Sequence, residues 1–98
     1  MFANIVYFPK VSPATLNFAK TADSTGKTVT VDTNDVTNLA SATATTTDAW
    51  ITPAISGNKV TVKVAANSED SAPARTGTVT VTVGTKTATI TVKQAANT

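Results

Sequence analysis

Apolar and polar residues alternate along several short segments of the chain, most clearly in its second half. A period of two is typical of β-strands that face a core on one side and water on the other. In these segments valine or isoleucine alternates with threonine or lysine. The pattern predicts strands over residues 27–32, 60–64, 78–83 and 87–93, and a short first strand over residues 16–18.

Turn signals separate the predicted strands. Gly84-Thr85-Lys86 lies between the last two and predicts a β-hairpin, and Ser56-Gly57-Asn58-Lys59 predicts a turn before Val60. Residues 39–47 alternate only weakly between Ala and Ser or Thr and are assigned to a further strand. No segment has a helical period with caps. Six or seven short strands divided by turns predict an all-β sandwich or small barrel.

The parity of the alternating positions also predicts the core. Residues on the apolar face of each strand should meet, while threonine and lysine face water. The predicted core contains Val29, Val31, Trp50, Val62, Val79, Val81, Ile90 and Val92.

Composition and charge narrow the class of protein. The chain has 98 residues, of which 41% are hydrophobic and 14% charged, which suits one folded domain. Threonine occurs 22 times and favours strands. The net charge is +2, and the seven lysines and one arginine form no run, so we expect no nucleic-acid binding. No stretch approaches the roughly 20 apolar residues of a membrane-spanning helix, so we expect no membrane partner.

The chain contains neither Cys nor His, which excludes Cys–His or Ser–His nucleophiles and the usual zinc sites. Glycosidases need two carboxylates facing each other across a cleft, whereas the carboxylates here fall in predicted turns or strand ends. A weak Ca²⁺ site is conceivable among them, but the spacing of an EF-hand is absent. We therefore expect no catalysis, no metal and no cofactor. The carboxylates are Asp23, Asp32, Asp35, Asp48, Glu69 and Asp70.

Two further side chains have alternative interpretations. Trp50 is the single tryptophan and serves either as a stacking platform for a sugar ring or as an aromatic that packs between the sheets. We favour the packing role. Arg75 is the single arginine and either binds a carboxylate of a partner or makes local backbone contacts. We favour the local contacts.

An ordered set of fragments from Ser12 to Ala96 resembles the BACON domain, a Bacteroidetes-associated module usually described as carbohydrate-binding. The resemblance implies an immunoglobulin-like β-sandwich of about seven antiparallel strands over residues 12–98, and it implies glycan binding. The chain departs from the family pattern at Asp35-Val36-Thr37, where an aromatic residue is common. The fragments are Leu16-Asn17-Phe18, Val29-Thr30-Val31, Thr33-Asn34, Trp50-Ile51, Gly57-Asn58, residues 60–64, Asn67, residues 75–81, Gly84 and residues 91–95.

Residues 1–11 lie outside that resemblance and are rich in large apolar side chains. We predict either an extra edge strand on this domain or an arm that docks onto a partner protein. The candidate partner-binding residues are Phe2, Ile5, Val6, Tyr7 and Phe8.

Two functions follow as expectations. A single module that begins at Met1 without an evident signal sequence suggests a structural decoration protein on the surface of a bacteriophage virion, bound to capsid or tail proteins and holding glycans. The alternative is a carbohydrate-binding module of an extracellular or cell-surface Bacteroidetes protein.

Overall fold

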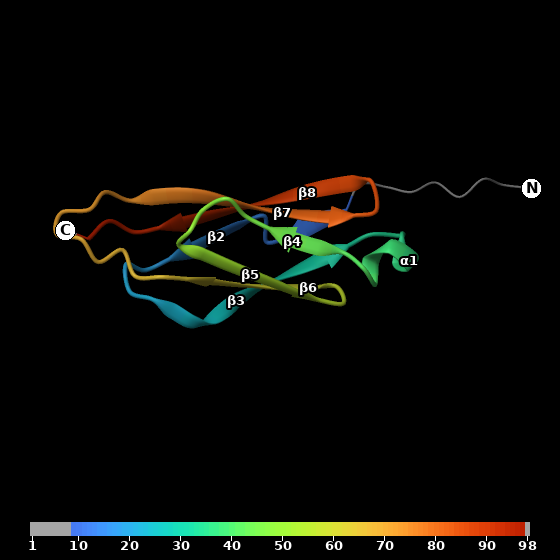
Figure 1. Ribbon diagram of the computed structural model, residues 1–98, viewed down its shortest axis with the longest axis horizontal. Helices are drawn as coiled ribbons and strands as arrows, with labels where there is room; N and C mark the ends of the chain where they lie inside the picture. The colour runs from blue at the N-terminus through green and yellow to red at the C-terminus, as the bar shows by residue number, and fades with distance from the viewer. Residues whose placement is uncertain (1–8, 98) are drawn as a thin grey trace, which may run out of the picture.

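The computed structural model of the protein describes residues 9–97. Within these residues, eight strands form two four-stranded sheets that pack face to face (Figure 1). One short helical turn lies between the third and fourth strands. The elements are β1 (Lys10–Ser12), β2 (Thr15–Phe18), β3 (Asp23–Asp32), α1 (Val36–Leu39), β4 (Thr43–Thr45), β5 (Ile51–Ser56), β6 (Lys59–Val64), β7 (Arg75–Val83) and β8 (Lys86–Gln94).

The strand order is that of an immunoglobulin-like sandwich. The first sheet has the order β1-β3-β6-β5 and the second the order β2-β8-β7-β4. These orders correspond to strands A-B-E-D and C-F-G of immunoglobulin domains, with strand A divided into β1 and β2. The chain passes from one sheet to the other at Pro13, and this division gives eight strands instead of about seven. It also makes β2 and β8 parallel, whereas every other pair is antiparallel as expected.

The hydrophobic core lies between the two sheets. The predicted core valines and Ile90 are at most 2% exposed, so the parity of the strands is confirmed. Trp50 differs from this expectation, because it is half-buried and packs against the core from one end of the sandwich. The reason is its position in a loop immediately before β5, outside the alternating strands.

The predicted strand over residues 39–47 is only partly correct. Residues Thr43–Thr45 form β4, a short edge strand, but Leu39 is the last residue of the single helical turn α1 and residues 40–42 form the turn between them. Asp35 caps that turn, since its Oδ1 atom accepts a hydrogen bond from the Asn38 backbone N–H at 3.2 Å. A helix of four residues is too short to produce a recognisable period, which explains why sequence patterning missed it.

The edge strand β5 contains a proline that limits its pairing with other chains. The Ala65 N–H donates to the Trp50 carbonyl at 2.9 Å. Along an antiparallel pair of strands, every second residue directs its backbone N–H towards the partner strand. Trp50 is hydrogen-bonded to Ala65, so Pro53, three residues later, has its backbone nitrogen directed away from β6. Proline has no N–H, so the open edge lacks a donor at that point and is a poor template for an added strand.

The outer faces of the two sheets differ in chemistry. That of the first sheet carries Lys10, Lys59 and Lys63 together with Asp32. That of the second sheet, which we call the threonine face, carries one charged residue among twelve outward positions. The threonine face consists of Thr15, Asn17, Thr43, Thr45, Thr76, Thr78, Thr80, Thr82, Thr87, Thr89, Thr91 and Lys93.

Val81 provides a test of the assigned facing. Its side chain is fully buried at the centre of the second sheet, between Ala44 and Ala88 in register. We expect Val81→Ala to lower the free energy of unfolding by about 1–3 kcal/mol, because two methyl groups are lost and a cavity remains. Urea denaturation measures the change. Thr80→Ala, on the threonine face, should cost less, and equal costs would contradict the facing.

Candidate functional site

The predicted arm lies outside the part of the chain that the structure describes. Phe2, Ile5, Val6, Tyr7 and Phe8 all precede residue 9. Strand β1 begins at Lys10 and pairs with the end of β3, so it spans the boundary drawn between arm and sandwich. Docking of the arm onto a partner therefore stays a prediction.

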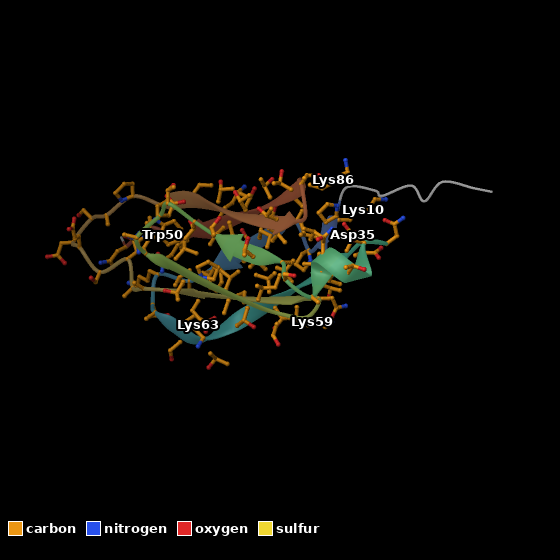
Figure 2. All side chains as sticks on the ribbon, turned by 45° about the vertical axis from the view of Figure 1, so that its right-hand side comes forward. Lys10, Asp35, Trp50, Lys59, Lys63 and Lys86 are labelled. Atoms are coloured by element: carbon orange, nitrogen blue, oxygen red, sulfur yellow. The ribbon has the colours of Figure 1, made fainter. Side chains whose placement is uncertain are left out.

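Trp50 and Arg75 come together at one end of the sandwich, although 25 positions separate them in the sequence. The Arg75 guanidinium lies 4.4 Å from the centroid of the Trp50 ring, a cation–π contact. Figure 2 shows Trp50 at the opposite end of the molecule from Lys10, Asp35 and Lys86. The guanidinium covers one face of the ring, and Trp50 also packs against the core. This arrangement favours the packing role over a sugar-stacking platform.

Arg75 makes the local contacts expected of it. Its Nε donates to the Gln94 Oε1 atom at 2.7 Å, and its Nη2 donates to the carbonyls of Ala65 and Ala66 at 3.3 and 3.2 Å. Those carbonyls belong to the loop that follows β6. The guanidinium thus holds the loop against the start of β7 while it stacks on Trp50.

Gln94 is the centre of the polar network at this end. It is the last residue of β8 and is 1% exposed. Its Nε2 atom donates to the Ala65 carbonyl at 2.8 Å and to the Ala19 carbonyl at 3.2 Å. One amide therefore joins β8, the loop after β2 and the loop after β6, while its oxygen accepts from Arg75.

Asn67 fixes the loop between β6 and β7 in a similar way. Its side chain is 6% exposed, and its Nδ2 atom donates to the carbonyls of Pro73 and Ala95 at 2.9 and 3.0 Å. Its backbone N–H donates to the Lys20 carbonyl at 2.8 Å. Asn67 and Gln94 are buried amides with satisfied hydrogen bonds, which is the pattern of structural residues.

Asp48 acts as an edge cap. Its Oδ2 atom accepts a hydrogen bond from the Thr78 backbone N–H at 3.0 Å, and the Thr46 hydroxyl donates to the Thr78 carbonyl at 2.7 Å. These two side chains satisfy the β7 backbone beyond the end of β4. The Asp48 carboxylate is thereby committed to the fold.

The other carboxylates are distributed over β3, the N-cap of α1 and the loop before β7. The Asp23 Oδ1 atom accepts from the backbone N–H groups of Thr25 and Gly26, at the irregular start of β3. Glu69 and Asp70 are exposed in the loop before β7. Across residues 9–97, no group of three or more potential ligands could hold a metal ion. The conceivable Ca²⁺ site thus receives no support from the geometry.

Sequence patterning missed the roles of Gln94 and Asn67. Gln94 lies on the same inward face of β8 as Ile90 and Val92. A polar residue at an inward position is the feature of the sequence that could have indicated its structural role. Asn67 lies in a polar loop, where no periodic pattern distinguishes it from its neighbours. No helix of the described residues is long and apolar enough to cross a membrane.

Comparison with known proteins gives a family match. The model of the BACON family, described as "Putative binding domain, N-terminal", matches residues 40–95. No curated protein sequence matches the chain.

Two solved structures are similar. A Bacteroides ovatus GH5 xyloglucanase in complex with a XXXG heptasaccharide is 26% identical with a TM-score of 0.65. The match covers 89% of this chain but only 18% of the xyloglucanase chain. An NMR structure of a protein from Bacteroides thetaiotaomicron is 15% identical with a TM-score of 0.55, and the match covers 98% of this chain and 91% of that one. At that identity the second likeness concerns the fold alone.

Proposed function

Because the chain belongs to the BACON family, whose model covers more than half of it, we propose that it is a non-catalytic, glycan-binding domain. The proposal places it outside the cell or at the cell surface, where polysaccharides are available. The domain contributes attachment to a glycan, and any cleavage belongs to other proteins or domains.

The similarity to the xyloglucanase carries this proposal. A segment of that enzyme amounting to 18% of its chain shares the fold and 26% of the residues of this protein, and the enzyme was solved with a heptasaccharide. A chain that corresponds to so small a part of a glycan-active enzyme is more readily an accessory binding domain than a catalytic one.

The commitments of the polar residues support the non-catalytic part of the proposal. Asp48 caps β7, Asp35 caps α1 and Asp23 holds the start of β3. Glycoside hydrolysis needs two carboxylates about 5–10 Å apart on either side of the scissile bond. Carboxylates that hold separate parts of the fold are poorly suited to that task.

Virion decoration is the first of the two functions expected from the sequence. The BACON family match and the likeness to a glycan-bound enzyme support the glycan-binding alternative. Attachment of the protein to capsid or tail proteins stays a prediction.

A binding measurement tests the proposed function. We expect the purified protein to be retarded in native gels containing soluble xyloglucan, and to bind the XXXG heptasaccharide in calorimetry with a dissociation constant in about the micromolar-to-millimolar range. The same assays with other neutral β-glucans define the preference. Failure of the protein to bind any of these neutral glycans would contradict the proposal.

A further inference from the structure

We infer that the threonine face is the surface on which a neutral glycan chain lies. This inference rests on the proposed function and adds to it the location of the site and the chemical class of the ligand. It moves the site away from Trp50, the residue that glycan binding would first suggest.

The threonines are aligned in rows across the four strands of the second sheet. Antiparallel pairing aligns β4, β7 and β8, and the parallel pairing of β2 continues two of the rows. The rows are Thr43–Thr82–Thr87, Thr45–Thr80–Thr89, Thr78–Thr91–Thr15 and Thr76–Lys93–Asn17.

The size of the face suits an oligosaccharide. Strands lie about 4.8 Å apart and outward residues on one strand about 6.7 Å apart, so each row of three residues is about 10 Å long and the four rows together extend about 20 Å along the strands. That area accommodates several sugar rings side by side with the strands or across them. The face is part of one continuous sheet, so it is held rigid before any ligand binds.

The chemistry of threonine matches that of a sugar ring. Each threonine presents a hydroxyl, which both donates and accepts hydrogen bonds, beside a methyl group. Sugars likewise present hydroxyls next to C–H groups. Within residues 9–97, no intramolecular hydrogen bond engages the ten threonine hydroxyls of this face. They are therefore available to a ligand that carries hydroxyls of its own.

The charge of the face selects a neutral ligand. Lys93 lies in the last row and is the one charged side chain on it, whereas three lysines occupy the outer face of the first sheet. A nucleic acid or an acidic glycan would find little positive charge on the threonine face. A protein partner would find none of the aromatic anchors that usually dominate interfaces. An uncharged, hydroxyl-rich chain is the complementary partner.

Trp50 is a poor alternative platform. Arg75 covers its ring at 4.4 Å and is itself held by Gln94 and the loop after β6. Exposing that ring face to a sugar would require this network to open. The threonine face needs no such rearrangement.

The test removes hydroxyls and keeps the shape of the side chains. Thr80 and Thr89 are register partners at the centre of the face. We expect the double variant Thr80→Val/Thr89→Val to weaken binding of soluble xyloglucan by about tenfold, since two hydroxyls are lost. Thr80→Ser/Thr89→Ser keeps both hydroxyls and should bind within about threefold of the unchanged protein. The matched control is Thr28→Val/Thr61→Val, the equivalent register pair on the first sheet, which should leave binding unchanged.

The outcomes separate this inference from the proposed function. If the unchanged protein binds xyloglucan and Thr80→Val/Thr89→Val binds equally well, the site is wrong and the function stands. If the unchanged protein binds no neutral glycan, both are wrong. A dimer of the unchanged protein in sedimentation that is lost in Thr80→Val/Thr89→Val would also overturn the inference, because a second copy would then cover the face. Valine is favourable in strands, so each variant should remain folded, which circular dichroism checks.

Discussion

Replacing Gln94 by alanine is expected to lower the free energy of unfolding by about 3–5 kcal/mol. The side chain is 1% exposed, and its loss leaves the Arg75 Nε–H without its acceptor and the Ala19 carbonyl without its side-chain donor. Buried groups deprived of a hydrogen bond cost about 1–3 kcal/mol each, and the cavity adds to this. Urea denaturation followed by the fluorescence of Trp50 measures the change, because Trp50 reports on the stacked guanidinium.

Lys93→Ala is the control for Gln94. Lys93 is the preceding residue of β8 and points outward, so its replacement should cost less than about 1 kcal/mol. If the two variants unfold at the same urea concentration, the amide network contributes little and the end of the sandwich is held by other contacts.

Replacing Gly77 by valine is expected to lower the free energy of unfolding by about 3–5 kcal/mol, because the added side chain has no space. A Cβ atom at this position would overlap Ile51 Cδ1 and lie 2.7 Å from Asp48 Oδ2. Ile51 is in the core and Asp48 caps the Thr78 N–H, so both must shift. Overpacking costs about 1–3 kcal/mol, and the loss of a charge-assisted hydrogen bond costs about as much again. Thermal and urea denaturation measure the change.

Gly57→Asn is the control for Gly77→Val. Gly57 has a φ of +59° in the turn between β5 and β6, and nothing lies within 4 Å of an added Cβ. Asparagine tolerates this left-handed conformation, so the cost should stay below about 1 kcal/mol. A Gly77→Val variant as stable as Gly57→Asn would show that the space around Gly77 is not restricted.

Strand positions and facing could be predicted from the sequence, but strand pairing could be predicted only for the hairpin of β7 and β8. Val60, Val62 and Val64 alternate with lysine and threonine, and this local pattern predicts β6 and its buried face. The parallel contact of β2 with β8 depends on the chain crossing between sheets at Pro13. Alternation of side chains carries no information about which strand lies alongside, so that pairing came only from the structure.

The candidate sites differ in how far the sequence could predict them. The cation–π contact joins Trp50, in the loop before β5, to Arg75, the first residue of β7. These residues lie 25 positions apart, and no local sequence pattern links them. The threonines of β7 and β8 could be read from parity alone. Their alignment into rows could not, because it depends on the register of each pair.

The parallel contact of β2 with β8 has a mechanical consequence. Thr15 lies beside Thr91 and Phe18 beside Gln94, so the two strands overlap along four aligned positions. The β1 and β2 strands enter from one end of the long axis, and β8 leaves towards the other, where the C-terminus lies (Figure 1). A pulling force between the two ends of the sandwich would run along both strands in opposite directions. The hydrogen bonds between β2 and β8 would then be loaded in shear, all at the same time, and would not break one after another. Such a geometry suits a domain that must stay folded under tension.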